Sequence, residues 1–380
     1  MPVFSCGGMR YQQSWKDDPW ESVSPDCQEN LENVILRSLS FGINHIETAR
    51  GYGTSELQLG KILPRLPREK LIVQTKIAPA PAPEFLQNFS RSMSLLKLDY
   101  LDLLAIHGIN NSQLLEITLR KGGALQAARQ LQREGRVRFI GFSTHAPTHI
   151  IVQALATGEF DYVNLHWYWI NTTNTPALEE ASRQDIGVFI ISPNDKGGKL
   201  YSPPKKLVEL CQPLTPMAFN DLFCLLRPEI HTLSLGAARP SDFDAHIEAL
   251  QHLPQAHRLV PAIEKRLHHA LVNHHGEDWI AHWAKGIPEF DQIPGEINVW
   301  EILRLWTYAT ALDMVEFAKM RYNLLGNGSH WFPGKNAASF DEVKILHALR
   351  NSPFAQRIPS ILRQAHELLS DEPVQRLSKT

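Results

Sequence analysis

Four residues that can cooperate in proton transfer lie in or just after short apolar segments in the first third of the chain. Glu47 and Tyr52 lie in and just after the segment NHIET, Lys76 ends LIVQTK, and His107 ends YLDLLAIH. When hydride reduces a carbonyl, the oxygen gains negative charge, so a proton donor must stand close to it. An acid, a phenol, an ammonium and an imidazole gathered in one place suit this reaction.

Each of the four side chains has its own expected role. Tyr52 is the proton donor, although a phenol with an ordinary pKa of about 10 gives up its proton reluctantly near neutrality. The cation of Lys76 stabilises the phenolate and lowers that pKa. Glu47 keeps the lysine charged and in place, while His107 orients and polarises the carbonyl. Taken singly, each residue also has an ordinary structural explanation, so the prediction depends on the four lying together.

The segments that would position these residues alternate between short apolar runs and amphipathic helical stretches. This pattern builds a parallel sheet covered by helices. Eight such units that close on themselves form a (β/α)8 TIM barrel, an α/β fold with its chemistry at the carboxyl ends of the strands. An open doubly wound sheet is the alternative, but no G-x-G-x-x-G turn follows the first strand. The eight predicted strands are 2–6, 44–48, 71–76, 100–107, 138–143, 162–167, 187–192 and 231–236.

The alternation stops near residue 255, and the remaining sequence is largely helical and rich in tryptophan and histidine. A chain of 380 residues is also long for one ordinary core. We therefore predict two domains, a barrel at 1–255 and a helical, Trp-rich C-terminal extension at 256–380. Within the extension, the apolar spacing over 299–325 predicts one substantial helix. Its histidines complete no known ligand spacing, so no metal site is expected, and its tryptophans suit core or lid packing better than base stacking.

Composition and charge narrow the classes of partner. The chain has 38 basic and 40 acidic residues, and no Lys/Arg block is dense enough to follow a phosphate backbone, so nucleic acid is an unexpected partner. No apolar run approaches the roughly 20 residues that cross a bilayer, and the first residues lack a secretory pattern, so we expect no membrane association and a cytoplasmic location. The four cysteines stand far apart without a Cys-x-x-Cys pair and are expected to be reduced and structural.

The stretch GINHIETARGYGTSELQLGKIL, followed by IVQTK, DYLDLLAIH and GRVRFIGFS, resembles the aldo/keto reductase family in order and spacing. The resemblance covers most of residues 1–253. It implies a barrel that binds NADPH without a glycine-rich fingerprint and reversibly reduces the carbonyl of an aldehyde or ketone. It also implies an Asp, Tyr, Lys, His tetrad, whose roles carry onto Glu47, Tyr52, Lys76 and His107. Glu47 replaces the usual aspartate and is one methylene longer.

The same resemblance implies a set of cofactor-binding residues in the loops that follow the strands. After the last strand, we expect Ser241 or Asp242 to cap a helix, and Arg239 to make a bidentate contact with a phosphate. An arginine at this place favours NADPH over NADH. The implied cofactor-binding residues are Gly8, Met9, Ser143, Asn164, Ser192, Pro193, Lys196, Gly236, Arg239 and Asp242.

Some positions depart from the family pattern. Thr144 stands where an amide side chain is common, Leu165 or His166 replaces a usual glutamine, and Ile191 lies where an aromatic ring often stacks on the nicotinamide. The extension resembles a ferredoxin-like unit found in one branch of the family, but it contains no cysteine, so no iron–sulfur cluster is expected. These departures leave an alternative open, in which the barrel is a catalytically weak NADP(H)-binding sensor or interaction protein.

Overall fold

The computed structural model describes residues 1–374 and divides the chain into two compact units. The first unit contains Met1–Gly197 and Asn220–Ala256, and the second contains Gly198–Phe219 together with residues 257–374. The sequence predicts a single division. It does not reveal that the excursion between the seventh and eighth strands belongs with the later helices.

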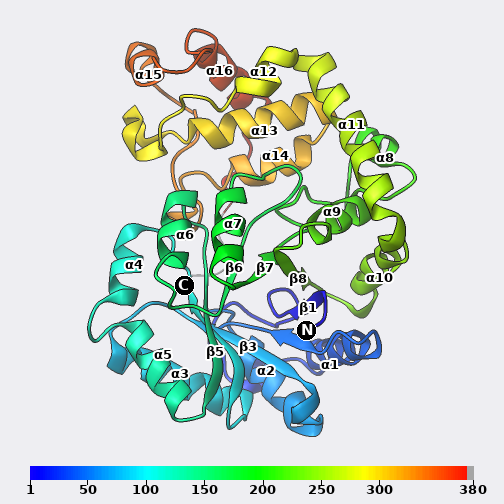
Figure 1. The fold of residues 1–380 in the computed structure, drawn as a ribbon, viewed down its shortest axis with the longest axis vertical. Coiled ribbons are helices and arrows are strands. Elements are labelled where there is room, and N and C mark those ends of the chain that lie inside the picture. Colours follow the sequence, from blue (N-terminus) through cyan, green and yellow to red (C-terminus); the bar gives the residue numbers. More distant parts are fainter. Residues whose placement is uncertain (375–380) are drawn as a thin grey trace. The chain divides into compact units, whose positions relative to one another are not determined.

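Eight parallel strands form a closed barrel in the first unit (Figure 1), which confirms the predicted (β/α)8 fold. Each strand pairs with the next in chain order, and the first strand also pairs with the eighth. Because all strands run the same way, their carboxyl ends meet at one rim. The strands are β1 (Phe4–Gly7), β2 (His45–Glu47), β3 (Ile72–Ile77), β4 (Leu101–His107), β5 (Val137–Ser143), β6 (Tyr162–Leu165), β7 (Gly187–Ile191) and β8 (Ile230–Gly236).

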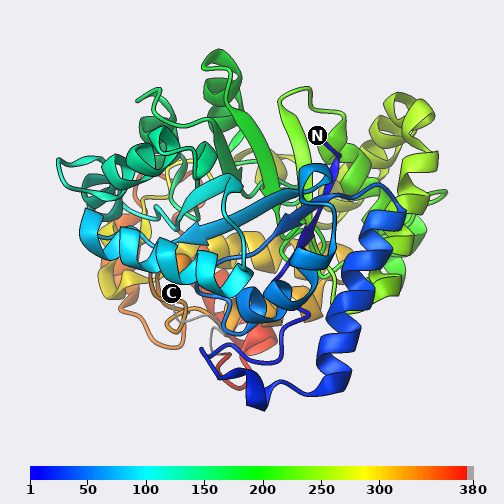
Figure 2. The same cartoon turned by 90° about the horizontal axis from the view of Figure 1, so that it is seen from below.

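Helices lie around the outside of these strands (Figures 1 and 2). The first of them shows why they form: the Ser24 hydroxyl accepts from the backbone N of Cys27, 3.2 Å away, and Pro25 opens the helix. Helix α9 begins in the second unit and ends in the first. The helices of the first unit are α1 (Pro25–Ser40), α2 (Ser55–Ile62), α3 (Ala82–Leu96), α4 (Ser112–Leu119), α5 (Ala124–Arg133), α6 (Thr148–Leu155), α7 (Thr175–Arg183), the end of α9 (Pro216–Leu225) and α10 (Asp244–Gln251).

A polar chain crosses the interior of the barrel beside its apolar core. The Nε2 atom of His45 lies 2.9 Å from Oε1 of Gln74, and Gln74 donates from Nε2 to Oδ1 of Asn164 at 2.9 Å. All three side chains are fully buried. Burial lowers the pKa of His45 to about 4, so this imidazole is neutral near pH 7. The chain therefore fixes the amide of Asn164 without burying an unpaired charge.

The second unit is helical and packs around aromatic side chains. The rings of Trp279 and Trp306 are 5.7 Å apart, and those of Trp283 and Trp300 are 5.4 Å apart. These contacts agree with the expectation that the tryptophans pack a core. The helices are α8 (Lys205–Cys211), most of α11 (Ala256–His275), α12 (Glu277–His282), α13 (Val299–Leu312), α14 (Val315–Tyr322), α15 (Glu342–Ala348) and α16 (Ile358–Leu369).

The single helix predicted over 299–325 is wrong. The chain forms α13 and α14 with a break between them, because Asp313 adopts a left-handed conformation with φ of 58°. A short polar residue tolerates this conformation and ends the first helix. The apolar spacing continues past the break, since Phe317 and Ala318 are buried, and this continuity hides the break from the sequence.

Candidate active site

Neighbouring strand ends place the four predicted catalytic residues at one rim of the barrel. Glu47 is the last residue of β2, Lys76 is the last but one of β3, and His107 is the last of β4. Tyr52 lies in the loop between β2 and α2. All four side chains are buried, so their mutual contacts are shielded from bulk water.

Glu47 and Lys76 form a buried ion pair. Nζ of Lys76 lies 2.6 Å from Oε1 of Glu47 and also donates to the carbonyl oxygen of Thr48 at 3.1 Å. Burial alone would raise the pKa of Glu47, but the ammonium outweighs it and holds that pKa below its ordinary value. Burial alone would lower the pKa of Lys76, but the carboxylate, and after it Tyr52, raise it. Both groups are therefore charged near neutral pH.

Tyr52 contacts two other members of the predicted tetrad. Its hydrogen bond with Lys76 is among the causes that raise the pKa of the lysine, whose Nζ lies 5.3 Å from the centre of the phenol ring. The ring of His107 meets the phenol edge to face, with 5.6 Å between centroids. Trp15, from the loop after β1, contacts the same ring at 6.0 Å. The phenol thus lies between an ammonium and an imidazole, which can stabilise its anion and orient its proton.

The residue after Tyr52 must be glycine for this arrangement to form. Gly53 has a φ of 55°, a conformation that residues with a side chain rarely adopt. A Cβ atom at this position would lie 2.0 Å from the carbonyl oxygen of Ser14. The close approach of the two loops therefore depends on the G-Y-G sequence and brings Trp15 against the phenol.

The loops after β4 and β5 are joined behind His107. The backbone N of Gly108 donates to both the carbonyl oxygen and the hydroxyl of Ser143, at 2.9 and 3.1 Å. Thr144 donates its hydroxyl proton to the carbonyl oxygen of Ile109 at 2.7 Å. Ser143, one of the predicted cofactor residues, is the last residue of β5 and is buried.

The other predicted cofactor residues also lie at or beyond the carboxyl ends of strands. Gly8 and Met9 follow β1, and the backbone N of Gly8 donates to the carbonyl oxygen of Glu47. Gly236 is the last residue of β8. Asn164 lies inside β6, and its Nδ2 donor is buried without a hydrogen-bond partner among residues 1–374. Such a donor suits the carbonyl oxygen of a nicotinamide carboxamide, so this end of the barrel fits a nicotinamide cofactor.

The loop after β7 carries three further predicted residues in a tight turn. Ser192 has a φ of 55°, and its carbonyl oxygen accepts from the backbone N of Lys196 at 3.1 Å. Pro193 lies between them and presents its carbonyl oxygen to Asn220 at 3.2 Å. The turn is thus built from backbone as well as side-chain bonds.

One expectation about the loop after β8 is wrong. Neither Ser241 nor Asp242 is the N-cap residue, because both lie inside a short 3-10 helix, Pro240–Phe243, whose N-cap is Arg239. Asp242 completes a capping box from within that helix, since its Oδ2 accepts from the backbone N of Arg239 at 3.3 Å. It also accepts from the Nε atom of Arg239 at 3.0 Å and from the backbone N of Ala238 at 2.9 Å. The guanidinium, largely exposed, is therefore held beside a carboxylate.

A cluster of basic side chains at this rim was not found by sequence reasoning. Nζ of Lys196 lies 3.4 Å from Nε2 of His145 and 3.3 Å from Nε2 of His166. Nδ1 of His166 lies 2.5 Å from the hydroxyl of Tyr168, which donates to the carbonyl oxygen of Ile191. The available signal was a histidine near the end of each of two predicted strands, since His166 lies within 162–167 and His145 lies two residues beyond 138–143. Leu165, the other residue that could replace the family's usual glutamine, is buried and lies within β6.

The aldo/keto reductase family model matches residues 4–197, just over half of the chain. The chain belongs to the aldo/keto reductase family. This match covers the segments of all four residues described above and the turn after β7. Members of this family are oxidoreductases that use a nicotinamide cofactor.

Individual relatives share about a third or less of their aligned residues with this chain. The chain is 30% identical over 179 residues to a probable aldo-keto reductase 1 of Glycine max, covering 43% of this chain and 50% of that protein. It is 26% identical over 262 residues to the L-galactose dehydrogenase of Arabidopsis thaliana, covering 60% and 80%. It is 32% identical over 150 residues to the D-arabinose 1-dehydrogenase of Saccharomyces cerevisiae, covering 36% and 41%. The aligned region thus spans about half the length of several of these relatives.

Solved structures of family members share the fold. An aldo-keto reductase from Bacillus halodurans matches with a TM-score of 0.57 and 19% identity, over 70% of this chain and 91% of that one. An aldo/keto reductase from Klebsiella pneumoniae, solved with NADP and acetate, matches with a TM-score of 0.52 and 19% identity, over 68% and 92%. At this identity the likeness supports the barrel and not a shared substrate.

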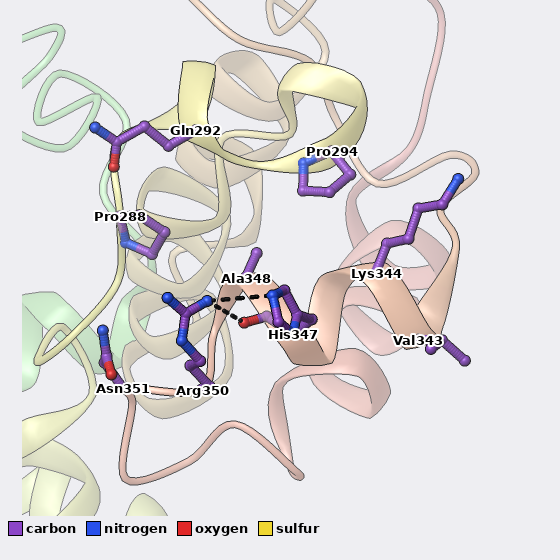
Figure 3. A pocket seen from close by; sticks show the side chains of 9 residues that line it. All are labelled: Pro288, Gln292, Pro294, Val343, Lys344, His347, Ala348, Arg350 and Asn351. Atoms are coloured by element: carbon purple, nitrogen blue, oxygen red, sulfur yellow. Dashed lines mark hydrogen bonds between the residues drawn. The ribbon is translucent and has the colours of Figure 1, made fainter.

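A surface pocket of about 610 Å³ lies in the second unit (Figure 3). It is lined by residues of α15, by the two residues 350 and 351 that follow this helix closely, and by residues of the separate segment 288–294. Arg350 donates there to the carbonyl oxygen of His347 at 3.1 Å. It contains none of the predicted site residues, so it does not bear on the chemistry at the barrel rim. Within residues 1–374, no three His, Cys, Asp or Glu side chains are grouped to hold a metal ion, and no helix is long and apolar enough to cross a membrane.

Proposed function

We propose that the protein is an NADPH-dependent oxidoreductase that reversibly reduces the carbonyl group of an aldehyde or ketone to an alcohol. One observation carries the proposal: a phenol lies between a buried ammonium and an imidazole, and the ammonium has its own buried carboxylate. In this arrangement Tyr52 supplies a proton to an oxygen that becomes negative, and Lys76 stabilises the phenolate that remains. His107 orients the carbonyl.

When bound, NADPH supplies the hydride. The residues proposed to hold it lie at or beyond the carboxyl ends of the strands: the amide of Asn164 for the carboxamide, and Ser143, which pairs with Asn164 across the sheet. The turn after β7, with Ser192 and Lys196, is proposed to hold the phosphates. Lys196 would bring positive charge to that anion, and the Nε2 atoms of His145 and His166 hold its ammonium at 3.4 and 3.3 Å.

The relatives support an oxidoreductase and leave the cofactor to be tested. Two are named as sugar dehydrogenases, and a 27% identical relative from Escherichia coli is named an NADH-specific methylglyoxal reductase. Arg239 would favour NADPH through contact with its 2′-phosphate. In that contact the guanidinium binds the phosphate and the carboxylate of Asp242 at the same time. We propose that Asp242 holds the guanidinium in place for that contact.

The test combines cofactor binding with turnover. The purified protein is titrated with NADPH and with NADH by fluorescence, and consumption of each is followed with a panel of small aldehydes, ketones and sugars. We expect tighter binding of NADPH, and consumption with at least one carbonyl substrate. Binding without consumption across the panel, in both reaction directions, would instead support the sensor alternative.

A single substitution separates the proposed acid from the rest of the site. Tyr52→Phe keeps the ring between Lys76 and His107 and removes only the hydroxyl, so kcat should fall by about 10²- to 10⁴-fold while NADPH affinity stays unchanged. The control is Tyr100→Phe, because Tyr100 precedes β4 at the opposite end of the barrel and contacts Arg68 through its ring. Turnover that survives in Tyr52→Phe would refute the assignment of the acid.

A further inference from the structure

Helix α9 anchors the loop after β7, residues 192–197, through a side chain that binds its backbone. Asn220 donates from Nδ2 to the carbonyl oxygen of Pro193 at 3.2 Å, and its Oδ1 accepts from the backbone N of Trp169 at 3.4 Å. A Cβ atom at Gly197 would lie 1.9 Å from that same carbonyl oxygen. The loop therefore closes tightly around a carbonyl group that α9 holds.

Asp221 follows Asn220 in α9, and Asn194 follows Pro193 in the loop. The imidazole of His246 links these two side chains. Nδ1 of His246 lies 2.5 Å from Oδ2 of Asp221, and its Nε2 lies 3.1 Å from Nδ2 of Asn194. Asp221 and His246 are each 1% exposed. A carboxylate only accepts and an amide nitrogen only donates, so the imidazole donates from Nδ1 and accepts at Nε2. One neutral tautomer satisfies both bonds at once.

We infer that Asp221 and His246 are positioning residues that fix Asn194, and through it the loop that presents Ser192 and Lys196 to the phosphates of the cofactor. The inference rests on the proposed function, in which this loop binds those phosphates. Neither residue of the pair lies in that loop, since they come from α9 and α10. They act on the cofactor only through the position of the loop.

The chemistry of the pair favours a positioning role over simple packing. A buried ionised or polar group costs desolvation energy, and apolar side chains of similar volume fill a core at least as well. The hydrogen-bonded relay Asp221–His246–Asn194 also fixes orientation, because each hydrogen bond is favourable only over a narrow range of angles. His246 also packs edge to face on Phe4 of β1, 5.7 Å between ring centroids, which limits rotation of its imidazole. A loop held in its binding geometry loses less conformational freedom when the ligand arrives.

The first test removes the side chain of Asn194, the member of the relay that lies in the loop. The buried pair of Asp221 and His246 keeps its own hydrogen bond. In Asn194→Ala, loss of one hydrogen bond should raise the Kd for NADPH roughly three- to tenfold, while kcat at saturating NADPH changes less than about twofold. The affinity for adenosine 2′-phosphate, which lacks the diphosphate, should not change. Asn44→Ala is the matched control. Asn44 has similar burial, immediately precedes β2 at the end of the barrel away from the rim, and donates to the carbonyl oxygen of Lys70.

The second test asks whether Asp221 works through its hydrogen-bond acceptor. Asp221→Asn keeps an oxygen that accepts from Nδ1 of His246, so NADPH affinity should stay within about twofold of wild type. Asp221→Leu removes the acceptor and should weaken NADPH binding at least as much as Asn194→Ala does. Thermal unfolding of each variant identifies any loss caused by misfolding, and Asn194→Ala keeps the inference testable if Asp221→Leu does not fold.

The outcomes separate the inference from the proposed function. If wild-type protein binds neither NADPH nor NADH, the proposed function fails and the inference fails with it. If wild type binds NADPH and Asn194→Ala binds it equally well, only the positioning inference is refuted. Equal weakening of NADPH and adenosine 2′-phosphate would also refute it, because the effect would then not be confined to the diphosphate loop.

Discussion

Glu47→Gln tests the ion pair at the centre of the site, because it removes one charge and keeps the size and shape of the side chain. The side chains of Lys76 and Glu47 are only 2% and 5% exposed, so water cannot replace the lost counter-ion. Breaking such a pair costs about 3–5 kcal/mol. Lys76 keeps its bond to the carbonyl oxygen of Thr48, so we expect the lower end of that range.

The pH dependence of stability gives the sharper signature. In the wild type, the pKa of Glu47 is lowered, so its contribution is present above about pH 4.3 and is lost as pH falls through the folded value. The pKa of Lys76 is raised, so its contribution is present below about pH 10.4 and is lost as pH rises through the folded value. The pair therefore contributes a constant amount near neutrality. In Glu47→Gln, burial acts on Lys76 without its counter-ion and lowers the folded pKa, so stability should rise as pH increases from 7 towards 10.

Thermal unfolding by circular dichroism measures both effects. A loss of about 3 kcal/mol lowers the midpoint of a domain this size by roughly 6–12 °C. The control is Glu180→Gln, since Glu180 and Arg183 pair at the same 2.6 Å separation but the arginine is 66% exposed, so water can take the place of the lost partner and the midpoint should change little. The double variant Glu47→Gln with Lys76→Met should be more stable than Glu47→Gln alone, because no unpaired charge is then buried. A midpoint for Glu47→Gln equal to that of Glu180→Gln, without a gain in stability at alkaline pH, would refute the reasoning.

Two further predictions concern packing and thiol chemistry. Gly60→Ala would place a Cβ atom 1.8 Å from the backbone oxygen of Leu95 where α2 crosses α3, so it should lower the free energy of unfolding in urea by about 1–3 kcal/mol or more, whereas Gly187→Ala, with its nearest contact at 3.5 Å, should cost less. Burial raises the pKa of Cys6 to about 12, so iodoacetamide at pH 8 should modify the half-buried Cys27 first, and mass spectrometry that finds Cys6 modified before unfolding would contradict this expectation.

The strands could be predicted because the apolar pattern of a barrel strand is local. All eight lie within two residues of their predicted bounds, and the two-residue errors are at the start of β1, which begins at Phe4 and not at 2, and at the end of β6, which ends at Leu165 and not at 167. The error at β6 has a structural reason. There the chain turns, because the backbone groups of Tyr168 and Asn171 bond to each other. A short apolar run does not reveal such a turn, since Trp167, two residues past the end of β6, is buried as a strand residue would be.

The polar pairs could not be predicted from spacing because they join distant parts of the chain. Asp221 and His246 are 25 residues apart and meet only after two helices pack. Arg239 and Asp242 are close in sequence, but which of them is the N-cap residue depends on backbone angles that the residue types do not determine. By contrast, the four rim residues lie at or just after strand ends, and parallel strands bring their carboxyl ends together whatever the conformation of the loops.

The exchange of the usual aspartate for Glu47 can be understood from the strand register. Glu47 pairs across the sheet with Gln74, and Lys76 lies two residues further along β3, a rise of about 6.6 Å. The ammonium also bonds to the carbonyl oxygen of Thr48, so it sits beyond the end of β2, and a carboxylate on Glu47 must extend along the strand to meet it. The additional methylene, about 1.5 Å of reach, provides part of that distance. The longer acid therefore reaches the ammonium at 2.6 Å, and the ion pair forms while Lys76 keeps its bond to the carbonyl oxygen of Thr48.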